Sequence, residues 1–236
     1  VHTAGKNKSS LDPFKEEKAE DIERLKNIQL DLHKDFIKVV EESRGDKLQK
    51  DGIELFSGEN LDGWKISENP GSFSIENKLL KVSGPRGHAF YAGKVGNADF
   101  KNFELLVEVK TMPKANSGIF IHTTYQETGW PEKGYEIQVN QSHSDWRKSA
   151  SLYAVQDVRE VYVQDGDWYT YHVVVKGDQI SVALNGKVVM EYDESADTKR
   201  IIGTDPKRFD RGTIALQAHD PESVIYYRSV KIKLLD

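Results

Sequence analysis

Residues 169–192 read YTYHVVVKGDQISVALNGKVVMEY, and this stretch decides the fold. It contains three short alternating runs, and turn signals separate them. Asn185-Gly186 is a strong signal for a two-residue hairpin, and Gly177-Asp178 marks another turn. The stretch therefore predicts three consecutive strands, Tyr169–Lys176, Ile180–Leu184 and Val188–Tyr192.

Similar runs fill the rest of the chain after about residue 50, and none shows a helical period longer than two turns. Eight more strands are expected, at Phe73–Ile75, Leu79–Val82, Phe103–Lys110, Gly118–Thr123, Tyr135–Asn140, Leu152–Val155, Thr213–His219 and Val224–Leu235. So many short strands within about 185 residues predict a mainly β sandwich or jelly roll over residues 51–236.

Residues 1–50 follow a different pattern and predict a long helix that extends the sandwich at its N-terminus. Asp12 is a candidate N-cap, and Pro13 suits the first helical position. Apolar residues then recur at steps of three or four, at Ile22, Leu25, Ile28, Leu32, Phe36 and Val39. A single amphipathic helix gains little stability alone, so we expect this stripe to pair with a second copy or to pack on the sandwich.

The composition excludes several classes of protein. There is no cysteine, which rules out disulfides, thiolate catalysis and Cys-ligated zinc. No apolar run approaches the roughly 20 residues that a membrane helix needs. The first residues lack an apolar signal core, so we expect a mature or truncated chain. The net charge of -5 argues against a nucleic-acid partner.

Three of the expected strands carry carboxylate, amide and imidazole groups on the face opposite to their apolar residues. These side chains are Glu136, Gln138 and Asn140 on one strand, Gln217 and His219 on another, and His122 on the third. Solvated sheet faces usually carry Lys, Glu and Thr, whereas this face is rich in Gln, Asn and His. The pattern leaves both a functional site and an ordinary solvated face open.

Aromatic residues crowd the loops beside these strands. Flat rings next to planar hydrogen-bonding groups suit a sugar, which has an apolar face and a rim of hydroxyls. The candidate substrate contacts are Tyr125, Trp130, His143, Trp146 and Tyr153. The alternative is that such rings close the ends of the sandwich.

A divalent metal is a further possibility at this face. A metal site needs several ligands within about 2.0–2.6 Å of the ion. His122, Glu136, His143 and His219 are able to converge, although no local spacing demands it.

Motifs across residues 53–236 go beyond these patterns. They include Leu55-Phe56-Ser57-Gly58, Leu61-Asp62-Gly63-Trp64, Asn116–Thr123, Gly134–Asn140 and Leu216-Gln217-Ala218-His219-Asp220-Pro221. Together they resemble the 3-keto-disaccharide hydrolase domain family. The resemblance implies a concanavalin A-like jelly roll with a concave sugar-binding sheet, a saccharide ligand, and a bacterial protein that is periplasmic or secreted.

Residues 1–50 resemble a second family. Thr3-Ala4-Gly5-Lys6, Asp12-Pro13-Phe14 and the segment from Asp31 to Leu48 are similar to the late helical part of signal peptide peptidase A-type serine proteases. The protease nucleophile and its lysine base would lie upstream of Val1, so no protease activity is expected.

The first resemblance implies cleavage of 3-keto-glycosides. A ketone at C3 acidifies the C2 proton, a base removes it, and the glycosidic oxygen at C1 leaves by elimination. Water addition then completes a net hydrolysis. We expect Glu136 to be the base, and His219 or His122 to be the acid at the leaving oxygen.

The remaining polar groups would support this reaction. Gln138, Gln217 and Arg228 are expected to stabilise the oxyanion or to orient the sugar, and a metal is an alternative to the amides. Two-carboxylate glycosidase chemistry is less favoured, because only one carboxylate lies among the polar strand residues.

Two other functions remain open. One is a non-catalytic carbohydrate-binding module, which would use the same rings and amides. The other is an inert scaffold whose N-terminal helix drives assembly.

Overall fold

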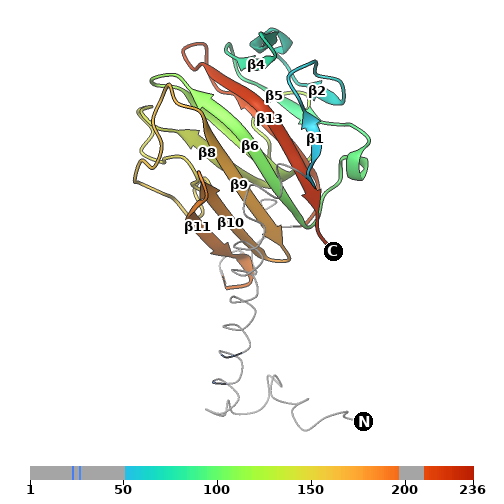
Figure 1. Ribbon diagram of the computed structural model, residues 1–236, viewed down its shortest axis with the longest axis vertical. Helices are drawn as coiled ribbons and strands as arrows, with labels where there is room; N and C mark the ends of the chain where they lie inside the picture. Colours follow the sequence, from blue (N-terminus) through green and yellow to red (C-terminus); the bar gives the residue numbers. More distant parts are fainter. Residues whose placement is uncertain (1–22, 24–26, 28–50, 197–209) are drawn as a thin grey trace. The chain divides into compact units, whose positions relative to one another are not determined.

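The computed structural model describes Glu23, Asn27, residues 51–196 and residues 210–236 (Figure 1). The chain divides into two compact units, Val1–Ser43 and Arg44–Asp236. Glu23 and Asn27 are helical. The rest of the predicted helix, its apolar stripe and the protease-like motifs lie outside the described residues, so these predictions and the pairing of two copies stay untested.

Residues 51–196 and 210–236 form two antiparallel sheets. The larger sheet follows the order β11-β10-β9-β6-β13-β4-β3, and β1 also pairs with β13. Its strands are β1 (Ile53–Phe56), β3 (Phe73–Glu76), β4 (Leu79–Val82), β6 (Phe103–Thr111), β9 (Tyr169–Lys176), β10 (Gln179–Leu184), β11 (Lys187–Asp193) and β13 (Ile225–Leu234). In Figure 1, β6, β9 and β13 lie side by side in this sheet.

The smaller sheet follows the order β2-β5-β12-β7-β8. Its strands are β2 (Trp64–Ile66), β5 (Gly87–Tyr91), β12 (Thr213–Ala218), β7 (Asn116–Thr123) and β8 (Tyr135–Asn140). Three short 3₁₀ segments complete the described elements: η1 (Pro70–Ser72), η2 (Val95–Ala98) and η3 (Glu194–Ala196).

The core lies between the two sheets and follows the period of two. On β8, Ile137 and Val139 are fully buried among the core residues, and on β6 Leu105 and Val107 are their counterparts from the larger sheet. Alternate side chains point to opposite faces of a strand, so each sheet gives one set to the core. The predicted mainly β sandwich is confirmed.

The hairpin between β10 and β11 forms where the sequence predicts it. Asn185 and Gly186 both have positive φ, at 48° and 79°, which suits the two-residue turns that match the twist of the strands. Leu184 and Lys187 are register partners across this turn.

Other parts of the fold differ from the prediction. Leu152–Val155 is not a strand, because Ala154 has a φ of 59° and the segment turns, leaving only isolated bridges at Leu152. The strands β1, β2 and β5 were not expected. All five residues of β5 are buried, so this strand has no apolar–polar alternation to reveal it.

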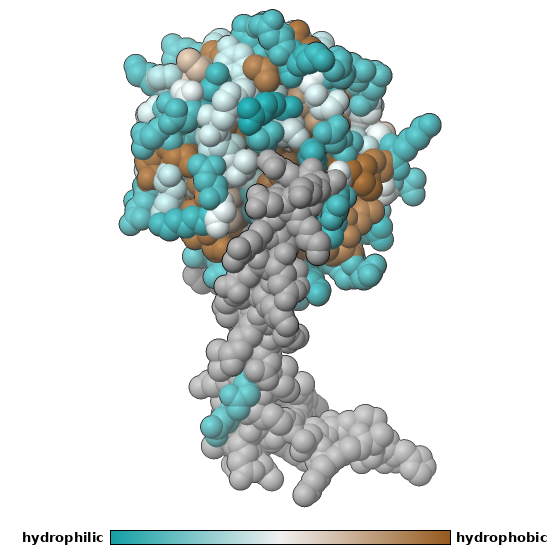
Figure 2. All heavy atoms as spheres, viewed as in Figure 1, coloured by the Kyte–Doolittle hydropathy of each residue, from teal (hydrophilic) through white to brown (hydrophobic). Residues whose placement is uncertain are grey.

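Most of the described surface in view is hydrophilic, with hydrophobic patches between the polar side chains (Figure 2). The large apolar side chains that are exposed are Ile53, Met112, Trp130, Trp146, Val161, Val188 and Leu234. No helix in the described part of the chain is long and apolar enough to cross a membrane.

Candidate functional site

The face of the smaller sheet that is turned away from the core carries two rows of side chains. In the first row, Glu136 on β8 pairs with Phe120 on β7, and Ala215 on β12 is the next partner of Phe120. In the second row, Gln138 pairs with Gly118, and Gln217 pairs with His88. Register partners share a face, so the strand pairing alone brings these groups together.

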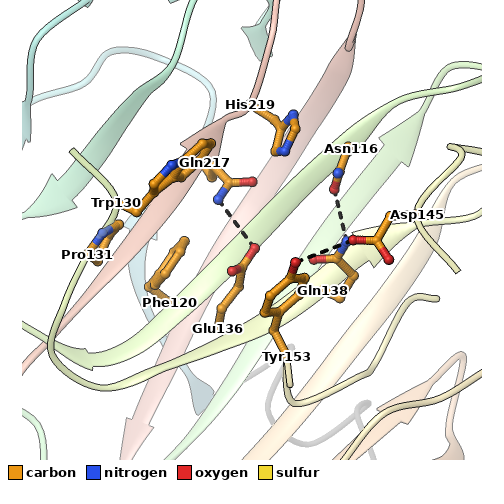
Figure 3. Close-up of a pocket in the computed structure, with 10 residues that line it drawn as sticks. All are labelled: Asn116, Phe120, Trp130, Pro131, Glu136, Gln138, Asp145, Tyr153, Gln217 and His219. Carbon is orange, nitrogen blue, oxygen red and sulfur yellow. Dashed lines mark hydrogen bonds between the residues drawn. The ribbon is translucent and has the colours of Figure 1, made fainter. Parts of the chain in front are cut away.

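A cavity of about 390 Å³ lies over this face (Figure 3). Its walls come from β7, β8, β12 and the loops that follow them. The lining residues are Asn116, Phe120, Trp130, Pro131, Glu136, Gln138, Asp145, Tyr153, Gln217 and His219.

The Glu136 carboxylate bends over Gly118. A Cβ atom on Gly118 would lie 2.4 Å from Glu136 Oε1, which is closer than real Cβ atoms approach a neighbour. Only glycine leaves this space open. The side chain thereby reaches Gln217, whose Nε2 donates to Glu136 Oε1 over 3.3 Å (Figure 3).

Gln138 and Gln217 each present a buried amide oxygen at the cavity. Both side chains are 1% exposed. The Nε2 of Gln138 donates to Asn116 Oδ1 over 2.9 Å, and the Nε2 of Gln217 is used by Glu136. Within residues 51–196 and 210–236, neither Oε1 atom has a hydrogen-bond partner. A buried acceptor without a partner costs about 1–3 kcal/mol, which a ligand hydroxyl would recover.

His219 is held by the next residue in the chain. Its Nδ1 lies 2.7 Å from Asp220 Oδ2, and the Ser223 hydroxyl donates to the same carboxylate oxygen over 2.8 Å. Burial raises the pKa of Asp220, but the hydrogen bonds from His219 and Ser223 outweigh it, so the pKa lies below its ordinary value. The carboxylate makes Nδ1 the donor, and Nε2 is then the ring nitrogen left for a ligand.

Asp145 adds a second carboxylate to the cavity. Its Oδ1 accepts from the Arg147 backbone N over 2.9 Å, and the Tyr153 hydroxyl donates to Oδ2 over 3.5 Å. Burial and then the Asp145 charge raise the pKa of Tyr153, so this hydroxyl remains a donor at neutral pH. The sequence predicted one carboxylate among the strand residues, and Asp145 joins it from the loop that follows β8.

The structure brings six of the predicted site residues to the cavity wall: Glu136, Gln138, Gln217, His219, Trp130 and Tyr153. The roles of these residues stay predictions.

The placement predicted for His122 is wrong. Its φ of 52° breaks the alternation of β7, and the ring turns against Phe103, with centroids 5.7 Å apart. Its Nε2 lies 2.9 Å from the Lys101 carbonyl, and Asp210 N donates to its Nδ1 over 3.2 Å. His122 is buried and does not line the cavity, so it is not positioned there to act as the predicted acid.

The placement predicted for Arg228 is also wrong. This residue lies on β13 in the other sheet, where it forms two hydrogen bonds to Glu108, of 2.7 and 3.2 Å. Its guanidinium also lies 4.7 Å from the ring centre of Trp168. Arg228 is therefore unable to orient a sugar in the cavity.

Asn140 faces the predicted side of β8 but supports the backbone. Its Nδ2 donates to the carbonyls of Asp145 and Arg147, over 2.9 and 2.7 Å, and the residue is fully buried. It shapes the loop that carries Asp145 instead of lining the cavity.

Three predicted aromatic and imidazole contacts are not among the lining residues: Tyr125, His143 and Trp146. Tyr125 packs edge-on against Phe90 at 5.3 Å. The His143 ring lies 5.7 Å from the ring of His219, which lines the cavity. Trp146 is 40% exposed and contacts the guanidinium of Arg159 at 3.9 Å.

Four cavity residues were not predicted as site residues: Asn116, Phe120, Pro131 and Asp145. Asn116 and Phe120 have the same parity as Gly118 on β7, so strand alternation was able to reveal them. Asp145 lies in a loop, where no periodicity indicates direction.

The described side chains do not form a metal site. Since His122 lies elsewhere, the predicted set of four ligands does not converge. Among residues 51–196 and 210–236, no three His, Asp or Glu side chains are arranged to hold an ion. The described residues therefore offer no ready set of ligands for a divalent metal.

Several known proteins are similar to this chain. Residues 51–233 match the family described as the 3-keto-alpha-glucoside-1,2-lyase-like domain. A 3-keto-disaccharide hydrolase of Bacteroides thetaiotaomicron is 25% identical over 230 aligned positions that cover 78% of each chain. A stretch of 58 residues is 60% identical to the Na(+)/H(+) antiporter NhaA of Brucella abortus, but the chain spans only 8% of that protein's length.

A solved structure from Parabacteroides distasonis, described as that of a candidate glycosyl hydrolase, is similar in fold. Its TM-score is 0.67 at 23% identity, and the match covers 80% of this chain and 97% of that one. The predicted concanavalin A-like sandwich is confirmed at the level of the fold.

Proposed function

Because the chain belongs to the 3-keto-alpha-glucoside-1,2-lyase-like domain family, as its motifs predicted, we propose that it cleaves 3-keto-glycosides at C1 by elimination. Membership of this family confirms the more general prediction that the chain holds a carbohydrate-active domain similar to glycoside hydrolases. The observation that supports this proposal is the cavity itself, where the Glu136 and Asp145 carboxylates, two unpaired amide oxygens and a carboxylate-held imidazole converge.

The first step is removal of the C2 proton by Glu136. The C3 ketone acidifies this proton, because the electron pair of the C2–H bond moves into an enolate. The hydrogen bond from Gln217 fixes the carboxylate over Gly118, where it faces the cavity. A fixed base lowers the barrier, since its orientation is set before the reaction.

The second step breaks the bond between C1 and the glycosidic oxygen. The enolate electrons form a C1–C2 double bond, and the leaving oxygen takes its electron pair together with a proton from His219. Asp220 accepts from Nδ1 over 2.7 Å and so orients the ring, which leaves Nε2 as the nitrogen that gives this proton. Water then adds its hydroxyl to C1, its other proton returns to His219, and Glu136 returns a proton to C2.

The side chains that line the cavity walls bind the sugar. The unpaired Oε1 atoms of Gln138 and Gln217 accept from sugar hydroxyls, and both are rigidly placed on strands. Trp130 and Phe120 present flat apolar surfaces on one side. The volume of about 390 Å³ lies in the range of small-molecule pockets.

The test is Glu136→Gln, with Glu132→Gln as its matched control. Glu132 is an exposed carboxylate on the loop before β8, outside the cavity. We expect the Glu136 variant to lose aglycone release from 3-keto-glucosides by about 10²–10⁴-fold, the usual contribution of a general base, while sugar binding persists. The control should keep full turnover.

A non-catalytic binding module is the second candidate, since the same unpaired acceptors would hold a sugar without cleaving it. Wild-type protein that binds 3-keto-glucosides but releases no aglycone would establish this alternative. Protein that neither binds nor cleaves would favour the inert scaffold. A parallel series with a chelator tests the metal that the sequence left open, and identification of the product separates elimination from net hydrolysis.

A further inference from the structure

A histidine that the mechanism does not use lies next to the cavity floor. His88 on β5 is the register partner of Gln217, so its side chain shares the sugar-facing side of the sheet. It is fully buried, with an exposed fraction of 0%.

Rings enclose the imidazole of His88. Its centroid lies 5.3 Å from that of Phe120, 5.8 Å from that of Trp130 and 6.0 Å from that of Phe90. In the part of the chain that the structure describes, neither Nδ1 nor Nε2 has a hydrogen-bond partner. A buried polar group without hydrogen-bond partners destabilises the fold, so a histidine at this position indicates a functional role for its ring.

The imidazole is neutral over the physiological range. Burial lowers its pKa to about 4, and Arg86 and His219 add to the decrease while Glu68 opposes it. A neutral imidazole has one N–H donor and one lone pair, and both are unused here.

Trp130 and Phe120 separate His88 from the cavity, because both line it and both pack on His88. Trp130 is 45% exposed and lies on the loop between β7 and β8. Its indole is held by ring contacts to His88 and His219 and by the guanidinium of Arg86, 5.1 Å from its ring centre. Of the two rings, only Trp130 is exposed, so rotation of its indole is the movement that would uncover His88.

We propose that His88 is a catalytic residue that Trp130 covers in the empty protein, and that its N–H donates to the C3 oxygen of the keto-sugar as enolate charge forms there. The inference rests on the proposed function, because that oxygen gains charge only if the C2 proton is removed. The location agrees with this role: Glu136 contacts Gln217, and Gln217 is the neighbour of His88 across the sheet. A neutral imidazole suits the role, since it stabilises an enolate without giving up its proton.

Kinetics of two variants test the donor. His88→Phe keeps a ring in the aromatic surroundings but has no donor, whereas His88→Gln keeps one. We expect the Phe variant to lose about 100-fold in kcat with KM within about threefold, and the Gln variant to lose markedly less. Ser67→Ala is the control, because Ser67 Oγ binds the backbone N of His88 and not its ring. A folded Phe variant with wild-type kcat would overturn the inference and leave the proposed function standing.

A binding measurement tests the contact between His88 and the keto-sugar in the absence of turnover. Full-chain Glu136→Gln protein labelled with ¹⁵N-histidine is titrated to saturation with a methyl 3-keto-glucoside or with its 3-hydroxy parent. We expect the ring-nitrogen resonances of His88 to move with the keto-sugar, and less with the parent. If they move although the wild type cleaves nothing, the contact stands and the proposed function fails. If they do not move, or if no sugar binds, the inference is wrong.

Trp130→Ala tests the cover. Diethyl pyrocarbonate should modify His88 readily in this variant and slowly in the wild type without sugar, as measured by mass spectrometry of the peptide. Equal rates in the two proteins would show that Trp130 does not cover His88.

Discussion

Substitution of one glycine tests whether the position of the Glu136 carboxylate matters. Gly118→Ala would place a Cβ atom 2.4 Å from Glu136 Oε1, 2.8 Å from Cγ and 2.9 Å from Cδ. Ordinary contact begins at 3.4 Å, so the carboxylate must move by about 1 Å. That shift breaks the 3.3 Å hydrogen bond from Gln217.

The fold should tolerate this change. The atoms that must move belong to a flexible side chain, and alanine is at least as favourable as glycine within a strand. We therefore expect an unchanged or slightly raised melting temperature. A displacement of about 1 Å in a catalytic group can lower kcat by about 100-fold.

The assay is release of p-nitrophenol from p-nitrophenyl 3-keto-glucoside. Gly71→Ala is the control, because a Cβ atom at Gly71 meets nothing within 4 Å. The double variant with Glu136→Gln should be no slower than Glu136→Gln alone, since both changes act on the same group. A folded Gly118→Ala protein with wild-type kcat, or additive losses in the double variant, would refute the reasoning.

Three further predictions concern stability and location. First, burial lowers the pKa of His88 to about 4, so between about pH 6.5 and pH 4 the imidazole is protonated only when the protein unfolds. Its contribution to the free energy of unfolding is therefore fully present above about pH 6.5 and is lost as pH falls toward about 4, by up to about 3 kcal/mol. Urea titrations at pH 7 and pH 4.5 should show a smaller loss of stability for His88→Phe than for the wild type. Second, Asn140→Ala should destabilise the fold by about 1–3 kcal/mol in chemical denaturation, because the carbonyls of Asp145 and Arg147 each lose a donor in a part-buried hydrogen bond; an unchanged midpoint would contradict the hydrogen bonds assigned to Asn140. Third, Arg228→Ala should keep wild-type kcat and KM and cost at most about 1 kcal/mol, since the side chain is half exposed on the other sheet; a raised KM would place it at the sugar.

Much of the candidate site was predictable from strand parity. Alternation alone places Glu136 and Gln138 on one face of β8, and Gln217 on the corresponding face of β12. The prediction succeeds because both strands have regular backbones and a fully apolar opposite face. The same rule fails at His122, because a single positive φ reverses the direction of its side chain.

The amino-acid sequence by itself determined the local elements of this protein. The runs within residues 169–192 and the turn at Asn185-Gly186 fix strands and a hairpin, because φ/ψ preferences and the period of two act between near neighbours. The family motifs are likewise short strings of adjacent residues, so the order of amino acids is enough to identify them.

Only the tertiary structure decided which strands became neighbours and which loop residues came to lie at the cavity. The pairing of β5 with β12 places His88 beside Gln217, although 129 positions separate them in the chain. The same is true of Arg228, which lies on the sheet opposite the cavity, and of Asp145, which reaches the cavity from a loop. These placements depend on burying the strands against one another over long sequence separations, and no local pattern encodes that packing.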